Sequence, residues 1–368
     1  MTIPKPRRVG AFLAATALLV LAACGSDSAK PAATTTTAAP AATDGPATST
    51  TAKPVQPVTI HFGASTASLA ALPWMVAIAS GTFEDERIVL KTDVLAGALT
   101  MTAVQGGAVD IGQVSIGEVF ALKAAGQDIT AIGIIGDRIP SIITLSNDAI
   151  KKSGVSPKAS VADRVKGLKG LTLGVTSLTA TTTRLVQAML VENGLAADAV
   201  NFQAVPQAGL VNAMRAGQID GFTLSPPDSL VPSIEGFGGV WINFAAGEYP
   251  PTVGPPVQVL VTTGRYLKAN PDAVRRFLSA LWSANTLIAG GTTPTVRNAV
   301  AAKWFPDMKA DVFNAGYTAM QPVYSTGLLP TEAGFKSALD TYNATAKDKA
   351  TLTFLDVFDL TLAKASRH

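Results

Sequence analysis

Two stretches of the chain, 110 residues apart, follow one pattern, and this repeat restricts the possible folds more than any other feature. The first is Ala103-x-x-x-Gly107-x-x-Asp110 and the second is Ala213-x-x-x-Gly217-x-x-Asp220. Each predicts a helix that ends at a glycine, a short turn containing an aspartate, and entry into a strand. Gly and Asp are common in turns, but the same order of expected strands and helices surrounds both copies. We therefore expect two lobes built on one plan.

A strand, a turn rich in hydroxyl groups and a helix are expected between Gly170 and Gly194. Leu171, Leu173 and Val175 alternate with smaller residues and predict a buried strand, and apolar residues at helical spacing follow up to Gly194. The turn between them contains Thr176, Ser177, Thr179, Thr181, Thr182 and Thr183. The unpaired N–H groups at a helix N-terminus, together with hydroxyls, suit a polar or anionic ligand. Capping the helix is the alternative role, but one hydroxyl suffices for that.

Other hydroxyl groups also follow expected strands. Ser65 and Thr66 come after the alternating strand that begins at Val58, and Ser115 and Ser225 occupy equivalent places in the repeat. Open α/β sheets bind ligands at the carboxyl ends of their strands. Two lobes that face each other would bring these side chains and the hydroxyl-rich turn toward one cleft. For Ser65 and Thr66 the alternative is a helix N-cap.

Two carboxylates accompany these serines, and each has two possible roles. Glu118 follows Ser115, and Asp228 follows Ser225. Each could complement the dipole of a helix in its first turn. Alternatively, one of them accepts a hydrogen bond from an amine or ring N–H of the ligand. We include Asp228 among the candidate ligand contacts.

Composition excludes several classes of protein. The formal net charge of +3 comes from Lys5, Arg7 and Arg8, and residues 1–23 contain no acid, so the remainder carries 3 − 3 = 0. A neutral body without a basic run argues against nucleic-acid binding. The chain contains two histidines and one cysteine, too few for a His/Cys metal cluster or a confident catalytic triad. His61, between Ile60 and Phe62, is expected to be an ordinary strand residue. We expect no metal and no cofactor.

The N-terminus predicts export and lipid anchoring. Residues 1–23 contain a basic region and an apolar run too short for a membrane span, as in a signal peptide. The run ends in Leu21-Ala22-Ala23-Cys24, which resembles the bacterial lipobox, whose cysteine is lipidated. A plain secretory signal that happens to contain a cysteine is the alternative. Residues 24–56 consist mostly of Ala, Thr, Pro and Ser and are expected to form a disordered tether.

The remaining chain, long enough for two domains, divides into three expected parts. Residues 57–150 would form the first part of lobe 1, residues 151–250 lobe 2, and residues 251–368 a return to lobe 1 with C-terminal helices. Strands are expected at 129–135, 141–145 and 257–261, and Asn270-Pro271-Asp272 predicts a helix start. The aromatic residues expected to anchor the packing of the C-terminal helices are Trp304, Phe313, Tyr317 and Phe354.

The order of these motifs resembles the nitrate/sulfonate/taurine-type substrate-binding proteins of ABC importers, a family related in fold to thiamine-pyrimidine precursor proteins. The resemblance covers about residues 57–290 and rests on Ala96-Gly97 followed by the first repeat copy, Gly170-Leu171-Thr172-Leu173-Gly174-Val175, Asn193-Gly194-Leu195, and Ala208 to Gly221. It implies an α/β fold of the periplasmic-binding-protein type II. Two Rossmann-like lobes with mixed sheets would be joined by two crossover segments, with the ligand cleft between them.

By position, the resemblance implies ligand contacts at Ser65, Ser115, Ser177, Thr181, Thr182 and Ser225. With Thr66, Thr179 and Asp228 these complete the candidate ligand-binding residues. The chain departs from the family after Ser115, where members often carry a proline and Glu118-Val119-Phe120 stands here. This departure leaves a zwitterion or a polar heterocycle open beside an anion.

The sequence thus favours an extracytoplasmic lipoprotein, monomeric and without catalytic activity, that binds a small polar or anionic solute such as a sulfonate, taurine or nitrate and delivers it to an ABC permease. Two alternatives stay open. One is a ligand-sensing lipoprotein that docks a receptor kinase. The other is an enzyme like the pyrimidine-precursor synthases, which needs a Cys/His-rich site.

Overall fold

The structure is a computed structural model, and it describes residues 56–64, 68–95, 97–178, 181–249, 255–324, 327–344, 346 and 348–366. The side chains of Gly97, Ala98 and Thr181 are outside this description. The expected signal peptide, the expected lipidation site Cys24 and residues 24–55 of the expected tether also lie outside it.

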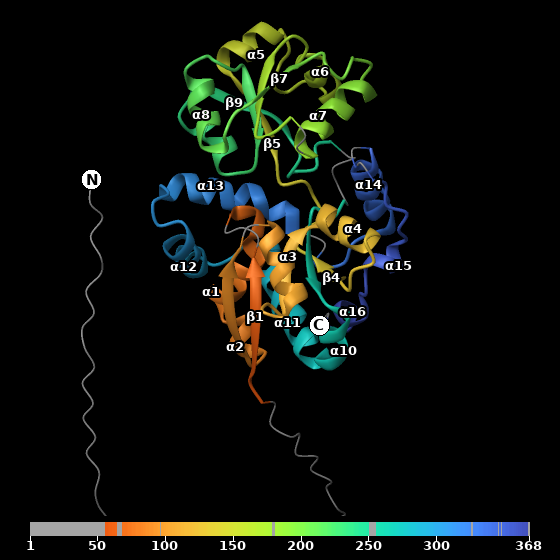
Figure 1. The fold of residues 1–368 in the computed structure, drawn as a ribbon. Helices are drawn as coiled ribbons and strands as arrows, with labels where there is room; N and C mark the ends of the chain where they lie inside the picture. Colours follow the sequence, from red (N-terminus) through yellow and green to blue (C-terminus); the bar gives the residue numbers. More distant parts are fainter. Residues whose placement is uncertain are drawn as a thin grey trace, which may run out of the picture. The chain divides into compact units, whose positions relative to one another are not determined.

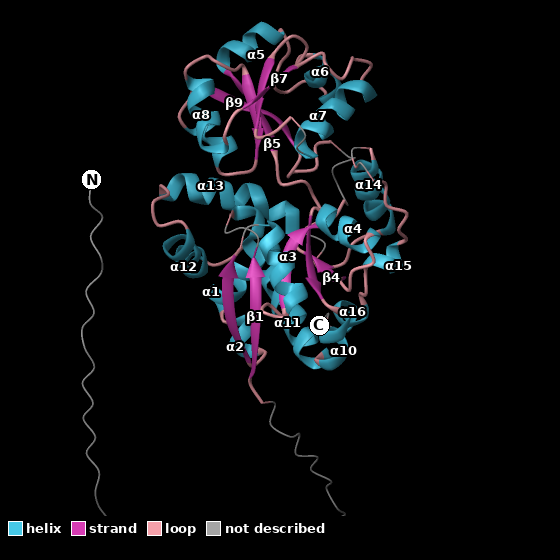
Figure 2. Cartoon of the chain, viewed as in Figure 1, coloured by secondary structure: helices cyan, strands magenta, loops and turns pink. Residues whose placement is uncertain are grey.

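Within the described residues, the strands form two five-stranded mixed sheets with the same strand arrangement (Figure 2). The first sheet has the order β2 (Ile88–Val94), β1 (Val58–Ala64), β3 (Ile111–Ser115), β10 (Gln258–Thr262) and β4 (Thr130–Ile134). The second has the order β7 (Asn201–Ala204), β6 (Thr172–Val175), β8 (Gly221–Leu224), β5 (Ile142–Ser146) and β9 (Gly238–Asn243). In each order the first three strands are parallel and the fourth is antiparallel to its neighbours. The expected α/β class with two mixed sheets is confirmed.

One expected boundary is wrong. We expected residues 57–150 to belong to the first lobe, but β5 pairs with β8 and β9 in the second sheet, and α5 (Asn147–Ser153) packs on it there. The chain therefore enters the second sheet at Ile142, and β10 returns to the first sheet. Apolar composition identified both strands, but pairing between strands far apart in sequence leaves no local signal.

The repeat seen in the sequence is a structural repeat. The helices α3 (Gly97–Gly106) and α8 (Gln207–Arg215) are followed by glycines at positive φ, +76° at Gly107 and +70° at Gly217. The aspartate that follows then hydrogen-bonds to a neighbouring strand. Asp110 Oδ2 accepts from the His61 N–H at 2.8 Å, and Asp220 Oδ2 accepts from the Thr172 N–H at 2.7 Å. Both copies thus fix a turn to the strand beside it by the same bond.

The first sheet and the helices packed on it enclose a core rich in aromatic residues. The helices α1 (Leu72–Ser80) and α11 (Pro271–Gly290) pack together over it, and the rings of Phe62 and Phe277 lie 5.4 Å apart. The helix α11 begins at Pro271 with Asn270 as N-cap, as predicted. The other helical segments of this lobe are η1 (Leu69–Ala71), α2 (Thr82–Asp85), α4 (Ile116–Ala124), α10 (Gly264–Ala269), α12 (Pro294–Trp304), α13 (Ala310–Met320), η4 (Gln321–Tyr324), α14 (Glu332–Asn343), α15 (Phe354–Val357) and α16 (Thr361–Ala365).

The C-terminal helices and their aromatic anchors agree with the prediction. Trp304 packs edge-to-face on Trp74 at 5.4 Å, and Phe313 lies 5.9 Å from Tyr317. Phe354 packs edge-to-face on the ring of Phe335. These rings are therefore packing residues, as aromatic residues at helical spacing usually are.

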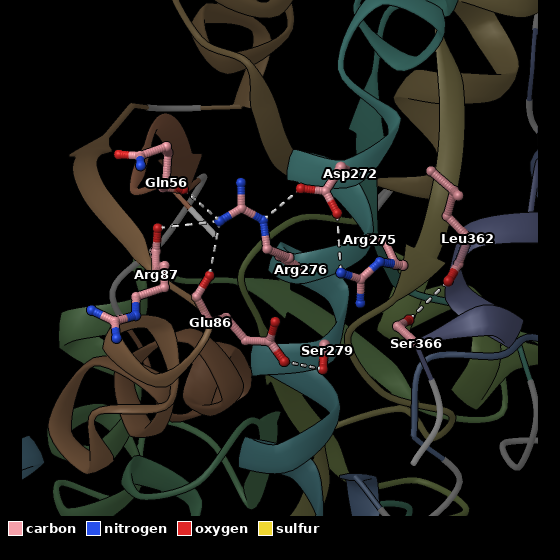
Figure 3. Close-up of polar contacts among 9 residues, drawn as sticks. All are labelled: Gln56, Glu86, Arg87, Asp272, Arg275, Arg276, Ser279, Leu362 and Ser366. Atoms are coloured by element: carbon pink, nitrogen blue, oxygen red, sulfur yellow. Dashed lines mark hydrogen bonds and ion pairs between the residues drawn. The ribbon is translucent and has the colours of Figure 1, made fainter. Parts of the chain in front are cut away.

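A buried arginine joins α11 to the start of the folded body (Figure 3). Arg276 Nη1 donates to the carbonyl oxygens of Gln56 and Glu86, each at 3.2 Å, and its Nε lies 2.9 Å from Asp272 Oδ2. Ser279, one turn further along α11, donates to the carboxylate of Glu86. The residues just before β1 are thus held at the amino end of the first sheet.

The second lobe is smaller. Figure 1 shows α5, α6 (Val161–Lys166), α7 (Thr181–Glu192) and α8 around its sheet, and η2 (Asp228–Leu230) and α9 (Val231–Ile234) complete it. It also contains a buried arginine. Arg164 Nη1 donates to the Trp241 carbonyl at 2.6 Å and to Glu248 Oε2 at 2.9 Å. This bond connects α6 to the segment that leaves the second lobe.

Within the described residues, no helix combines the length and the apolar character that crossing a membrane requires.

Candidate functional site

Hydroxyl side chains stand at the carboxyl ends of central strands in both sheets. Ser115 is the last residue of β3, and Ser225 follows β8 at the same distance from the repeat aspartate. Thr176 and Ser177 follow β6 directly. Ser115, Ser177 and Ser225 are half-buried, whereas Thr176 is exposed. The structure therefore places these residues at equivalent ends of the two sheets.

Several predicted contacts cannot be placed in this way. Ser65, Thr66 and Thr179 lie outside the described residues. Thr181 opens α7, but its side chain is outside the description, and Thr182 in the same first turn is half-buried. These residues stay predictions.

The segments that follow strands of the two sheets meet at one residue of α13. A Cβ built on Gly316 would lie 2.7 Å from Leu69 Cδ1 and 2.8 Å from Pro227 Cβ, so only glycine fits there. Leu69 follows β1 in the first lobe, and Pro227 follows β8 and Ser225 in the second. The two lobes therefore contact each other close to the strand ends that carry the predicted hydroxyls.

Part of the hydroxyl-rich turn has a structural role. Thr183 is 1% exposed, and its Oγ1 donates to the Ser177 carbonyl at 2.7 Å. This bond ties the first turn of α7 to the segment that follows β6. At least one of the hydroxyl groups in this turn therefore stabilises the turn itself.

Glu118 serves the start of α4. Its Oε2 accepts from the backbone N–H of Ser115 at 3.1 Å, which is the carboxylate half of a capping box. This is the first of the two roles considered for it. Asp228 begins η2, and its Oδ2 accepts from Gln207 Nε2 at 3.3 Å, so it links α8 to the segment after β8. Asp228 is half-buried and stays a predicted ligand contact.

Three cavities of about 310, 270 and 520 Å³ lie in the first lobe, and residues other than the predicted contacts line them. The second of these includes Asp110 and Tyr266. Burial, and then the negative charge of Asp110, raises the pKa of the Tyr266 phenol from 10.0 to about 12. The predicted site therefore rests on the strand ends and not on one of these cavities.

Among the described residues, no cluster of three or more His, Cys, Asp or Glu side chains suited to a metal ion occurs. His61 lies in β1 beside Lys91, as an ordinary strand residue.

Two mixed sheets of one strand order, joined by two crossings and meeting near their strand ends, define the periplasmic-binding-protein fold. The chain belongs to the NMT1-like family, whose model matches residues 51–304. Its resemblance to substrate-binding proteins of ABC importers is confirmed by the similar structures described next. A comparison with curated protein sequences gave no match.

Three similar solved structures illustrate the fold. The periplasmic aliphatic sulphonate binding protein SsuA of Escherichia coli has a TM-score of 0.60 and 15% identity, over 80% of this chain and 90% of that one. The alkanesulfonate-binding protein SsuA of Xanthomonas axonopodis pv. citri, bound to MOPS, has a TM-score of 0.54 and 19% identity, over 79% of this chain and 92% of that one. The periplasmic nitrate-binding protein NrtA of Synechocystis PCC 6803 has a TM-score of 0.55 and 12% identity, over 84% of this chain and 88% of that one.

Proposed function

We propose that the protein is the extracytoplasmic solute-binding component of an ABC importer, and that it captures a small polar or anionic organic solute between its lobes. The observation that carries this proposal is the position of Ser115, Ser177 and Ser225 at equivalent strand ends of two sheets whose following segments meet at Gly316. Family membership supports it. The sulfonate-binding and nitrate-binding proteins of the same fold suggest the class of solute.

Closure of the lobes would bury the solute without converting it. The chain crosses between the lobes from β4 to β5 and again from β9 to β10. These two crossings are hydrogen-bonded to each other, because Arg138 Nη1 in the first donates to the Ala246 carbonyl in the second at 2.8 Å. The Phe244 N–H donates to the Ser141 carbonyl at 3.1 Å. Two crossing segments bonded to each other could serve as a hinge about which one lobe rotates against the other as a rigid body. A solute that contacts both lobes would favour the closed form.

The N-terminal sequence supports the location proposed here. Export by residues 1–23 and lipidation of Cys24 would hold the body at the outer face of the membrane as a monomer, close to its permease. A diacylglyceryl group carries two chains, which is what stable anchoring requires.

A solute screen by thermal shift and calorimetry tests the function. The panel contains taurine, ethanesulfonate, MOPS, nitrate, bicarbonate, phosphonates, pyrimidines and amino acids. A solute at about a hundred times its Kd stabilises the fold by about 2.7 kcal/mol. Ser177→Ala combined with Ser225→Ala should weaken its binding by at least roughly tenfold, since each hydrogen bond to a charged group contributes about 1.5–3 kcal/mol.

Ser337→Ala on the exposed face of α14 is the matched control and should leave affinity unchanged. Full retention of binding by the combined Ser177→Ala and Ser225→Ala variant would contradict the site. A protein that binds nothing in the panel, or that turns a panel member over, would contradict the proposed function.

A further inference from the structure

An unpaired amide lies inside the first lobe. Gln113 is in the centre of β3, opposite Ala64 of β1 and Leu260 of β10, and is 0% exposed. Neither Nε2 nor Oε1 has a hydrogen-bond partner among the described residues. Leaving a buried donor and a buried acceptor unpaired is costly, and polar side chains in protein interiors are as a rule hydrogen-bonded.

The second lobe shows how the same position is satisfied. Gln113 stands three residues after Asp110, and Thr223 stands three residues after Asp220, so the repeat aligns them. Thr223 is also buried, but its Oγ1 lies 3.0 Å from Ser141 Oγ, within hydrogen-bond distance. The position therefore tolerates a buried polar group when a partner is present, and only the first lobe leaves it unpaired.

The place of Gln113 in the strand connects it to the proposed site. Successive side chains of a strand alternate between faces, so Gln113 shares a face of β3 with Ser115 at the strand's carboxyl end. Its neighbour Ala64 is the last residue of β1, directly before the predicted contact Ser65. The unpaired amide is thus close to the end of the sheet where a solute is expected.

We propose that Gln113 contacts the bound solute, and that this solute is a zwitterion that carries both oxyanion oxygens and an N–H donor, such as an aminosulfonate. This inference rests on the proposed function. The carboxamide offers donors at Nε2 and an acceptor at Oε1. A bare oxoanion has only acceptors, so it would pair with Nε2 and leave Oε1 unpaired. An ammonium group next to the anion satisfies both atoms.

Asp228 of the other lobe is the candidate for a second acceptor of the ammonium group. Asp228 follows Ser225, and it is half-buried beside Pro227, which contacts Gly316. Because the Gln113 side chain is fully buried, a solute reaches it only when the groups over it separate. Closure around the solute would then bury the contact again.

The test compares Gln113→Met with Thr223→Val in the full mature protein. Methionine keeps the length of the side chain and removes both polar atoms, and valine does the same for threonine. In the free protein, Gln113→Met should be at least as stable as wild type, because it removes an unpaired group. Thr223→Val should lower the unfolding midpoint, because it leaves Ser141 unpaired. A Gln113→Met variant that is destabilised like Thr223→Val would overturn the inference.

Calorimetry with taurine, ethanesulfonate and nitrate then tests the solute class. Wild type should bind taurine at least about tenfold more tightly than ethanesulfonate, which lacks the amine. Gln113→Met should remove most of that difference, and Thr223→Val should keep it. Equal binding of the two sulfonates by wild type, or a preference for nitrate, overturns the zwitterion. Failure of all three probes to bind also overturns the zwitterion inference. If a different member of the panel then binds, the proposed function still stands.

Discussion

The two lobes share a sheet order and an aspartate bond, but they differ in what surrounds the central strand. Ile111 in β3 and Gly221 in β8 each follow the repeat aspartate directly. Ile111 is fully buried in the aromatic core of the first lobe. At Gly221 a Cβ would lie 2.4 Å from the Thr144 carbonyl oxygen of β5, so the backbones approach too closely for any side chain. The repeat thus determines the conformation of the turn, whereas the neighbouring strand limits the space for the residue after the aspartate, Ile111 or Gly221.

The surroundings of the two aspartates differ as well. Asp110 lies beside the half-buried phenol of Tyr266, whereas Asp220 lies 3.5 Å from the exposed ammonium group of Lys152. Unlike the second lobe, the first lobe contains α11 and the C-terminal helices, and residues of these helices are part of its core. We infer that the first lobe is the scaffold that holds the start of the body, and that the second depends more on direct backbone contact.

The largest expected effect tests the difference in space. Gly221→Ala should lower the free energy of unfolding by about 3 kcal/mol, because the added methyl meets backbone atoms of β5 that cannot move independently. Ile111→Val, the matched change in the first lobe, should cost about 1 kcal/mol through a small cavity. Denaturant unfolding measures both. A Gly221→Ala variant as stable as Ile111→Val would show that the two positions do not differ as described.

The next effect tests what the lobes share. Asp110→Ala and Asp220→Ala each remove a charge-assisted bond to a backbone N–H, and each should cost about 2 kcal/mol. The corresponding Asn variants keep a neutral acceptor and should lose about half as much. Because the two sites are in different lobes, the costs should add in the double variant. Hydrogen exchange should show loss of protection at His61 in one variant and at Thr172 in the other. A cost below about 0.5 kcal/mol in either lobe would contradict a shared energetic role.

Much of this fold could be predicted from the sequence, because strands and helices leave periodic patterns. Apolar runs located β4, β5 and β10, and Asn270-Pro271-Asp272 located the start of α11. Pairing partners could not be predicted in this way, so β5 was assigned to the wrong lobe. The repeat was visible, but Asp110 and Asp220 were interpreted only as turn residues. Their bonds to strands 49 and 48 residues away depend on the tertiary structure.

The candidate site was predictable only in outline. Strand ends rich in serine and threonine pointed to it, and the structure places Ser115 and Ser225 at equivalent ends. The structural role of Thr183 and the choice between two roles for Glu118 needed coordinates. Gln113 gave no sequence signal on its own, because a glutamine in a strand is unremarkable until its neighbours are known. Aligning it with Thr223 in the repeat was the one available pointer.

The smallest effect concerns the surroundings of Asp110. Burial and the Asp110 charge raise the pKa of Tyr266 to about 12, so the folded state holds this proton more tightly than the unfolded chain does. The resulting stability is fully present below pH 10 and is lost as the pH rises through about 12. Burial also raises the pKa of Tyr317 and Tyr324, which contribute with the same sign. The free energy of unfolding of Tyr266→Phe should therefore fall less steeply than that of wild type between about pH 10 and 12. Denaturant unfolding at each pH measures both.

Lys152→Met is the control in the second lobe. Its ion pair with Asp220 joins an exposed ammonium group to a half-buried carboxylate and should contribute at most about 1 kcal/mol. Identical slopes for wild type and Tyr266→Phe between pH 10 and 12 would contradict the account of Tyr266.

The central claim is that a solute closes two duplicated lobes, and a distance between them tests it most directly. Spin labels on Lys91→Cys in β2 and Lys158→Cys in the second lobe, both exposed, can be placed in a Cys24→Ser background that has no other cysteine. With a saturating solute from the panel, the distance distribution measured by pulsed electron paramagnetic resonance should shift and narrow. At a solute concentration equal to the wild-type Kd, Ser177→Ala with Ser225→Ala should leave most of the protein in the free distribution. An unchanged distribution while calorimetry shows full binding would contradict closure.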